Sequence, residues 1–362
     1  MSAHSAMVDT PEKDLIACRE GAAGIIRLNR PKAINALTLE MTREIVVALD
    51  EFEADPGVSL VLLEGAGERG LCAGGDIRGL YESAKAGGDL GPVFWREEYI
   101  LNARIPEFPK PYVAYMDGLV MGGGVGLSAH GAHRIVTEKT KMAMPEVGLG
   151  FFPDVGGTWL LSRAPGEVGT YFALTGQTMT GADAVYAGAA DILIASSNWP
   201  ALRDALTNAP LQATGDDVRA IMAPYAATDI QVPVAAYRKQ IDRAFAHDTM
   251  EAIVAALEQD GSELALATLK ALSEKSPTAL KVTLELLRRG RNSKSLKESL
   301  IREYNSALAV FTSAEFVEGV RAAIIDKDRN PKWSPSRIEG VTPDIVEKYF
   351  APNGKYKLVF PG

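Results

Sequence analysis

A run of three glycines and the glutamate that follows it are the residues whose types and spacing most strongly suggest chemistry. Glycines 122–124 stand between an apolar segment at 111–115 and a predicted helix at 125–132, and Glu146 follows in an uncharged Met-Pro-Glu stretch. Because glycine lacks a Cβ, a ligand can approach its backbone, and the first N–H groups of a helix have no partner within it. Such a turn stabilises the oxyanion formed when a carbonyl is attacked, and a nearby carboxylate supplies a base or nucleophile. The pattern therefore predicts an enzyme that acts on a carbonyl compound.

A second glycine loop has the same position relative to its neighbours. Ala73-Gly74-Gly75-Asp76 follows an apolar segment at 58–63 and precedes a predicted helix at 77–84. If the two loops converge, one backbone amide from each could bind a single oxyanion. The plainer interpretation is that both are tight turns from strand to helix. Two such loops with an acid downstream favour a site.

Carboxylates are the best candidates for proton transfer in this chain. Glu146 and Asp154 lie in largely apolar stretches, and acids in such surroundings have raised pKa values and serve as acid, base or nucleophile. Asp154 could instead cap a helix that begins near Gly156. Glu97 and Glu98, on a predicted helix at 92–104, could be a solvated helix face. The pattern alone leaves these alternatives open.

The residue patterns of several other enzyme and binding classes are absent from this sequence. The glycine run does not have the spacing of a dinucleotide fingerprint, no phosphate-binding loop is present, and the one serine near it is not in a nucleophile elbow. There are four histidines, of which His130 and His133 are predicted to share a helix without the glutamate of the metalloprotease pattern. We expect them to cap or pack, and we expect no metal site.

The overall composition is that of an ordinary globular protein. The 362 residues are 47% hydrophobic and 23% charged, and the formal net charge of −8 argues against nucleic-acid binding. Two cysteines are too few for a disulfide framework or a cysteine zinc site. No apolar run is long enough to cross a bilayer, and residues 1–13 do not resemble a signal peptide. We expect a short disordered lead at 1–13 and a cytoplasmic protein without membrane contact.

The elements that position these residues change in type along the chain. A hairpin is predicted at 15–28, and Thr38 is a plausible N-cap for an amphipathic helix behind it. Strands then alternate with helices to about residue 194, which predicts an α/β core. After about residue 200 the pattern is mostly helical, with segments at 252–257, 263–272, 278–289 and 295–311.

Three motifs in this order resemble the crotonase, or enoyl-CoA hydratase/isomerase, superfamily. They are N-R-P-K-A-I-N-A-L at 29–37, C-A-G-G-D-I at 72–77 and M-G-G-G at 121–124, and residues 146–157 extend the match. The resemblance implies a spiral core of repeated ββα units over 14–205 and a mainly helical C-terminal region over 206–362. The stretches at 94–99, 122–128, 152–157 and 318–333 are most similar to a hydrolase branch of the superfamily and extend the resemblance to nearly the whole chain.

The resemblance also implies roles for individual residues. The amides of Gly75 and Gly123 would form an oxyanion hole, Glu146 would be the principal catalytic acid and Asp154 a second one. Whether Glu146 attacks the carbonyl or activates water stays open. The resemblance further implies a set of residues that bind the substrate's hydroxyl end and its CoA moiety: Glu98, Lys32, Ala33, Ala73, Asp76 and Ile77.

One departure from the hydratases of the superfamily shapes the expected reaction. Those enzymes carry a second glutamate just past the glycine run, where this chain has Gly126. We expect hydrolysis of a short branched 3-hydroxyacyl-CoA, such as 3-hydroxyisobutyryl-CoA of valine breakdown, with an enoyl-CoA hydratase or isomerase as the alternative. A non-catalytic acyl-CoA-binding protein is disfavoured because Glu146 and both oxyanion glycines are retained. No metal or redox cofactor is expected, since CoA arrives with the substrate, and the resemblance leaves a homo-oligomer open.

Overall fold

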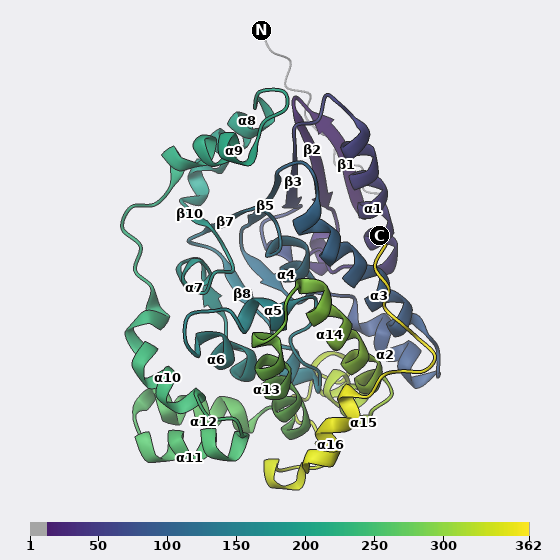
Figure 1. The fold of residues 1–362 in the computed structure, drawn as a ribbon, viewed down its shortest axis with the longest axis vertical. Helices are drawn as coiled ribbons and strands as arrows, with labels where there is room; N and C mark the ends of the chain where they lie inside the picture. The colour runs from purple at the N-terminus through teal and green to yellow at the C-terminus, as the bar shows by residue number, and fades with distance from the viewer. Residues whose placement is uncertain (1–12, 362) are drawn as a thin grey trace.

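The chain forms two β-sheets wrapped by helices (Figure 1). The computed structural model describes residues 13–361, so the predicted disordered lead lies outside them except for Lys13. The six-stranded sheet has the order β1-β2-β3-β5-β7-β10, in which only β1 is antiparallel to its neighbour. Its strands are β1 (Leu15–Glu20), β2 (Ala23–Leu28), β3 (Leu60–Gly65), β5 (Tyr112–Met116), β7 (His133–Thr137) and β10 (Ile192–Ile194). The smaller sheet has the order β4-β6-β8-β9, with β4 (Gly70–Cys72), β6 (Leu119–Met121), β8 (Lys141–Ala143) and β9 (Met179–Thr180).

The core is built by repeating one unit three times. Each unit adds one strand to the large sheet, one to the small sheet, and then helices. The first unit is β3, β4, α2 (Ile77–Lys85) and α3 (Leu90–Arg104); the second is β5, β6 and α4 (Gly123–Ser128). The third is β7, β8, a 3₁₀ turn (Glu146–Leu149), α5 (Gly157–Leu161) and α6 (Val168–Thr175). This arrangement confirms the predicted spiral of ββα units.

The repetition places three loops at one edge. Strands β4, β6 and β8 are parallel neighbours, so their carboxyl ends meet on the same side of the small sheet. Gly75 follows β4, Gly123 follows β6 and Glu146 follows β8. Residues that are far apart in the sequence are thereby brought to one point.

The large sheet is buried on both faces because its side chains alternate between two cores. Ile26 and Val61 point into the larger core, beneath α1 (Leu39–Ala54), while Ile25 and Leu60 point into a smaller one. The smaller core lies beneath α8 (Trp199–Thr207) and α9 (Gly215–Met222). Helix α1 begins as predicted, since Thr38 Oγ1 accepts a hydrogen bond from Met41 N at 3.2 Å.

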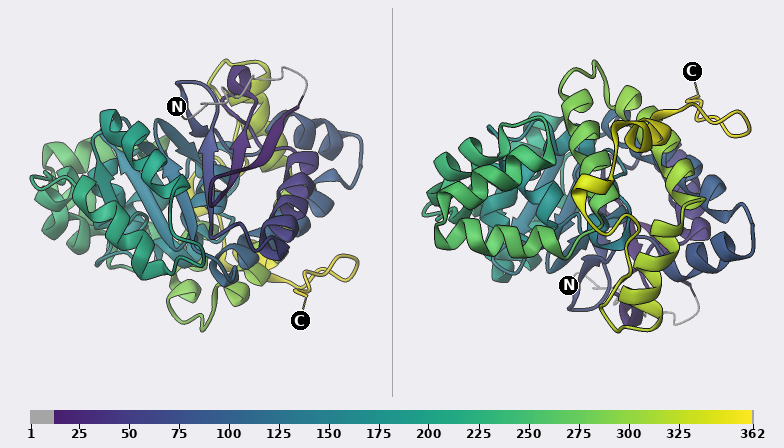
Figure 2. Two further views of the ribbon diagram at one scale, coloured as in Figure 1. Left: turned by 90° about the horizontal axis from the view of Figure 1, so that it is seen from above. Right: turned by 90° about the horizontal axis from the view of Figure 1, so that it is seen from below.

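The C-terminal region is helical and packs back onto the core. Seen from below, its helices lie in front of the sheets (Figure 2). Helix α14 lies against α3, and α15 lies against α2 and the turn at 146–149. The α-helices of this region are α9, α10 (Arg238–Phe245), α11 (Met250–Asp260), α12 (Glu263–Ser273), α13 (Pro277–Arg291), α14 (Leu296–Phe311), α15 (Ala314–Val320) and α16 (Pro343–Glu347). Helix α7 (Gly181–Tyr186) belongs to the core. The boundary at 205/206 stays a prediction.

Some local expectations were wrong. Strand β4 at 70–72 was not predicted, and the helix after the glycine run ends at Ser128 and not at 132. His133 begins β7 and does not share a helix with His130. Strand β4 has only three residues, which are too few to show the alternation of hydrophobic residues typical of a strand. Helix α4 is buried on every side, so its sequence has no polar face that would mark its end. Within 13–361, no helix is both long and apolar enough to cross a membrane.

Candidate active site

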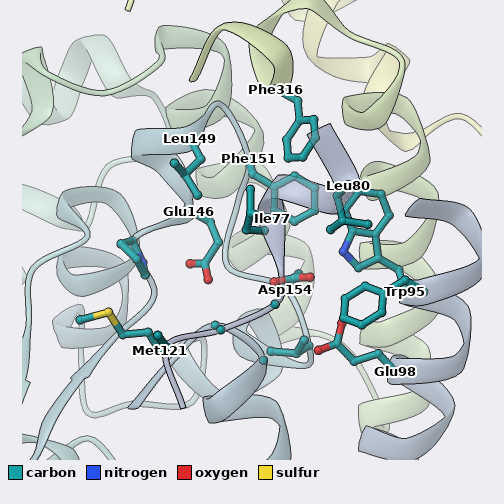
Figure 3. Close-up of a pocket in the computed structure, with 18 residues that line it drawn as sticks. Ile77, Leu80, Trp95, Glu98, Met121, Glu146, Leu149, Phe151, Asp154 and Phe316 are labelled. Atoms are coloured by element: carbon teal, nitrogen blue, oxygen red, sulfur yellow. The ribbon is translucent and has the colours of Figure 1, made fainter. Parts of the chain in front are cut away.

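A cavity of about 70 Å³ lies at the carboxyl ends of β4, β6 and β8 (Figure 3). Its wall includes five of the residues expected in a site, namely Gly75, Gly123, Glu98, Glu146 and Asp154. They come from the β4–α2 loop, the start of α4, the middle of α3, the turn after β8 and the loop before α5. The two glycine loops therefore converge.

The amides of Gly75 and Gly123 are free of the local backbone pairing. Leu37 N donates to Gly74 O and Asp76 N donates to Leu37 O, both at 2.8 Å, so the amide of Gly75 between them points the other way. Gly123 is the first residue of α4, where an N–H has no partner within the helix. A Cβ built on Gly123 would lie 3.5 Å from Gly75 N, which shows how close the two turns are.

Any side chain in place of Gly122 or Gly123 would collide with the acids that surround the glycine run. A Cβ on Gly123 would stand 2.7 Å from Glu98 Oε1, and a Cβ on Gly122 would stand 2.9 Å from Glu146 Oε1. Gly122 also has φ 48° and ψ −119°, a backbone conformation that side-chain-bearing residues rarely adopt. The backbone donors and two carboxyl groups thus share one small space.

Three carboxyl groups in this space are buried and close to one another. Glu98, Glu146 and Asp154 are 2%, 8% and 6% exposed. Burial raises the pKa values of Glu98 and Glu146 well above the ordinary value, and repulsion from the Asp154 carboxylate raises them further. Glu98 Oε1 and Glu146 Oε2 are buried without a hydrogen-bond partner among the described residues. Unpaired buried acids of this kind are typical of catalytic sites.

Asp154 differs from the other two acids because a tyrosine hydroxyl donates a hydrogen bond to it. Tyr99 Oη donates to Asp154 Oδ2 at 2.7 Å from the turn of α3 that also carries Glu98. Burial raises the pKa of Asp154 to about 7, and the Tyr99 hydroxyl opposes that rise by stabilising the carboxylate. The sequence analysis did not identify Tyr99, since no pattern marks a tyrosine that reaches a loop 55 residues away.

The loop that carries Asp154 is held from the C-terminal region. The buried carboxylate of Glu303, on α14, accepts hydrogen bonds from Gly156 N at 2.7 Å, Thr158 N at 3.0 Å and the Thr158 hydroxyl. Glu303 therefore satisfies the start of α5, and the suggested capping role for Asp154 is wrong. Burial raises the pKa of Glu303 to about 8. His130 Nε2 donates to Val155 O at 2.8 Å, so this histidine packs the same loop.

The position of Gly126 has no room for an acid. A Cβ there would lie 2.6 Å from Val155 Cβ and 2.9 Å from Asn102 Nδ2. The Asp154 loop and α3 occupy the space into which a longer side chain would extend. The site therefore has acids on the turn after β8, on the loop before α5 and on α3, and none on α4.

The neighbouring acid Glu97 and the remaining predicted contacts lie elsewhere. Glu97 faces outward and pairs with Arg43 at 2.7 Å. Ala73 and Ile77 line the cavity, whereas Asp76 faces an adjacent groove of about 330 Å³.

The predicted CoA-bordering turn lies just outside the cavity. Lys32 and Ala33 are exposed on the turn Pro31–Ala33, one residue before Ile34, whose carbonyl accepts a hydrogen bond from Ala73 N at 2.9 Å. The turn is therefore joined to the cavity wall, and its role at the CoA moiety stays a prediction. Within residues 13–361, no group of three or more His, Cys, Asp or Glu side chains is placed so that it could hold a metal ion.

Comparison with known proteins agrees with this architecture. A family model described as enoyl-CoA hydratase/isomerase matches residues 23–350. The 3-hydroxyisobutyryl-CoA hydrolase of Xenopus tropicalis, named as mitochondrial, is 44% identical over 98% of this chain and 94% of its own length. A solved carnitinyl-CoA dehydratase from Mycobacterium thermoresistibile is 46% identical with a TM-score of 0.91, over 97% of this chain and 99% of that one. An enoyl-CoA hydratase from Rhodobacter sphaeroides is 43% identical with a TM-score of 0.87, over 96% and 100%. The names of these relatives divide between thioester hydrolysis and reactions at a double bond.

Proposed function

This chain belongs to the enoyl-CoA hydratase/isomerase family, and from that premise we propose that it hydrolyses 3-hydroxyisobutyryl-CoA to 3-hydroxyisobutyrate and CoA. One observation carries the choice of reaction. Two free amides adjoin Glu146, while the place of the second hydratase glutamate is a glycine enclosed by Val155 and Asn102. A thioester carbonyl has its oxyanion donors and a reacting acid here, and a double bond lacks the second carboxylate on α4 that hydration in the family uses.

The thioester oxygen lies between the amides of Gly75 and Gly123. Negative charge develops on that oxygen when the carbonyl carbon is attacked, and each preorganised donor contributes about 3–4 kcal/mol to its stabilisation. Water supplies the new C–O bond, the C–S bond breaks, and CoA leaves as the thiol after protonation. Glu146 is the acid beside this carbon, either as the attacking carboxylate or as the base that activates water.

The other two acids have distinct tasks in this proposal. Asp154 is the acid to which Tyr99 donates a hydrogen bond, and this bond stabilises its carboxylate form. Its carboxylate positions water and keeps Glu146 in its working protonation state. Glu98 has an unpartnered oxygen beside Gly123, where it accepts a hydrogen bond from the 3-hydroxyl group.

Thiol release separates this reaction from the alternative. Purified protein is incubated with 3-hydroxyisobutyryl-CoA and, separately, with crotonyl-CoA, while free CoA and enone absorbance are followed. Free CoA from the first compound without loss of the enone in the second supports the proposal. Hydration of crotonyl-CoA without thiol release would support the hydratase, the reaction in the name of the Rhodobacter structure. A panel that includes 3-hydroxypropionyl-CoA identifies the preferred acyl group.

The remaining parts of the proposal concern the protein's surroundings. The reaction as written needs no metal or redox cofactor, and unchanged activity in the presence of a chelator tests this. A cytoplasmic location and a homo-oligomer are also proposals, although the Xenopus relative is named mitochondrial. Cell fractionation and light scattering of the purified protein test them.

A further inference from the structure

One end of the cavity is closed by aromatic rings from three parts of the chain. Trp95 lies on α3, Phe151 on the loop before α5, and Phe316 on α15. Trp95 stacks on Phe151 with ring centroids 5.2 Å apart, and Phe316 meets them edge-on or tilted at 6.3 and 6.1 Å. Figure 3 shows Phe316 and Phe151 above the cavity, with Glu146, Asp154 and Glu98 below them.

The cavity also adjoins an open groove. Leu80 and Phe94 line both the cavity and the groove of about 330 Å³, whose far wall includes the exposed residues Glu40 and Arg43. The long CoA moiety of a thioester has to reach solvent, so it leaves by this open side. The acyl group is then left with the enclosed part of the cavity, whose wall includes the aromatic rings.

Phe316 cannot easily move out of the way. A Cβ on Gly319 would overlap the backbone of Leu149, and a Cβ on Gly150 would overlap the backbone of Glu315, so α15 is pressed directly against the turn after β8. The Glu315 carboxylate also accepts hydrogen bonds from the Ser276 hydroxyl and from Ser334 N at 3.1 Å. The ring itself is 1% exposed.

We propose that Phe316 limits the length of the acyl group that this enzyme accepts. The inference rests on the proposed thioester hydrolysis. A short branched acyl group ends before the ring, and each further methylene of a straight chain meets a side chain that the backbone behind it holds in place. Pockets discriminate single methylenes by about 10-fold or more in kcat/KM, so one aromatic side chain is enough to set a limit.

The experiment compares Phe316→Ala with a matched variant from the same cluster. Phe311 lies 6.2 Å from Phe316 and packs on Gly91 but does not line the cavity, so Phe311→Ala removes an equal ring without opening the site. Thiol release is measured for 3-hydroxyisobutyryl-, 3-hydroxyhexanoyl- and 3-hydroxyoctanoyl-CoA. We expect the ratio of kcat/KM for the longest to the shortest substrate to rise at least 10-fold in Phe316→Ala and to stay at the wild-type value in Phe311→Ala.

The outcomes separate the two levels of inference. If the wild-type protein releases CoA from none of these substrates, the proposed function fails. If it cleaves the short substrate but the ratio in Phe316→Ala equals that in Phe311→Ala, only the role of Phe316 fails. Should Phe316→Ala not fold, Phe316→Leu keeps the core filled and is expected to raise the ratio about 3-fold; an unchanged ratio there overturns the inference equally.

Discussion

Two parts of this molecule bury carboxyl groups to a similar degree and treat them in opposite ways. At the end of β3, Glu64 is 5% exposed and accepts hydrogen bonds from Arg27 Nη2 at 2.6 Å and from Arg203 Nε at 3.0 Å. In the cavity, Glu146 and Glu98 are as deeply buried, and no ion pair of the described residues includes them.

The difference shows what each site is for. A buried carboxylate with two guanidinium partners is compensated, and removing it leaves those cations unpaired. Glu303 is buried without a cation, but three hydrogen-bond donors satisfy its carboxylate. Glu146 and Glu98 have no cation, and each keeps a buried oxygen without a hydrogen-bond partner among the described residues. The presence or absence of such partners, and not burial itself, separates the structural acids from the candidate catalytic ones.

The largest expected effect comes from exchanging the two kinds of glutamate for glutamine. Glu146→Gln should lower kcat at least 1,000-fold, because it removes the reacting acid, while stability is kept. Glu64→Gln should keep kcat and lower the free energy of unfolding by about 3 kcal/mol. Thiol release and urea unfolding of both variants measure this. Equal loss of activity in the two would erase the distinction.

A smaller effect is expected from adding a methyl group at the oxyanion turn. Gly123→Ala places a Cβ 2.7 Å from Glu98 Oε1, so the turn must shift and its amide moves off the thioester oxygen. The expected loss in kcat/KM is about 100-fold. Gly215→Ala is the control, because its Cβ at the start of α9 meets only the side chains of His133 and Arg219, at 3.4 and 3.6 Å. Full activity in Gly123→Ala would remove its amide from the proposed hole.

The unpaired acids should also make stability depend on pH. The folded-state pKa of Asp154, about 7, exceeds its unfolded value of about 3.8, so the folded protein binds more protons between these values. Stability is therefore full below about pH 4 and falls as pH rises through 7. Asp154→Asn removes this contribution and should be more stable than wild type at pH 8 by about 4 kcal/mol. If the unfolding free energies of the variant and the wild type changed equally with pH between 5 and 8, the expectation would be refuted.

The smallest effect concerns the donor to Asp154. Tyr99→Phe removes a hydrogen bond to the ionised carboxylate, so the pKa of Asp154 rises and the acidic limb of the kcat/KM profile moves up by about one pH unit. Tyr304→Phe is matched to it, because Tyr304 is equally buried and its hydroxyl donates only to Pro92 O, at 2.9 Å. The control should lose stability with an unmoved profile. A shift of equal size in both variants would show that the change is not specific to Asp154.

The local features of this fold could be predicted from the sequence. Thr38 begins α1 as its type and spacing predicted, and the alternation of strands and helices to residue 194 gave the α/β core. It also singled out Gly75, Gly123, Glu146, Asp154 and Glu98, which the structure brings to one cavity. These features are legible because they depend on neighbours a few residues away, or on motifs that resemble a family.

Only the tertiary structure decided which acids have partners and which do not. Glu97 and Glu98 are adjacent in the chain, yet one pairs with Arg43 in solvent and the other is buried without a partner beside Gly123. Glu303 reaches Gly156 across 147 positions, and Phe316 closes the cavity from α15. Hydrogen bonds and burial between such distant segments exist only after the helices have packed, so no local pattern of residue types can reveal them.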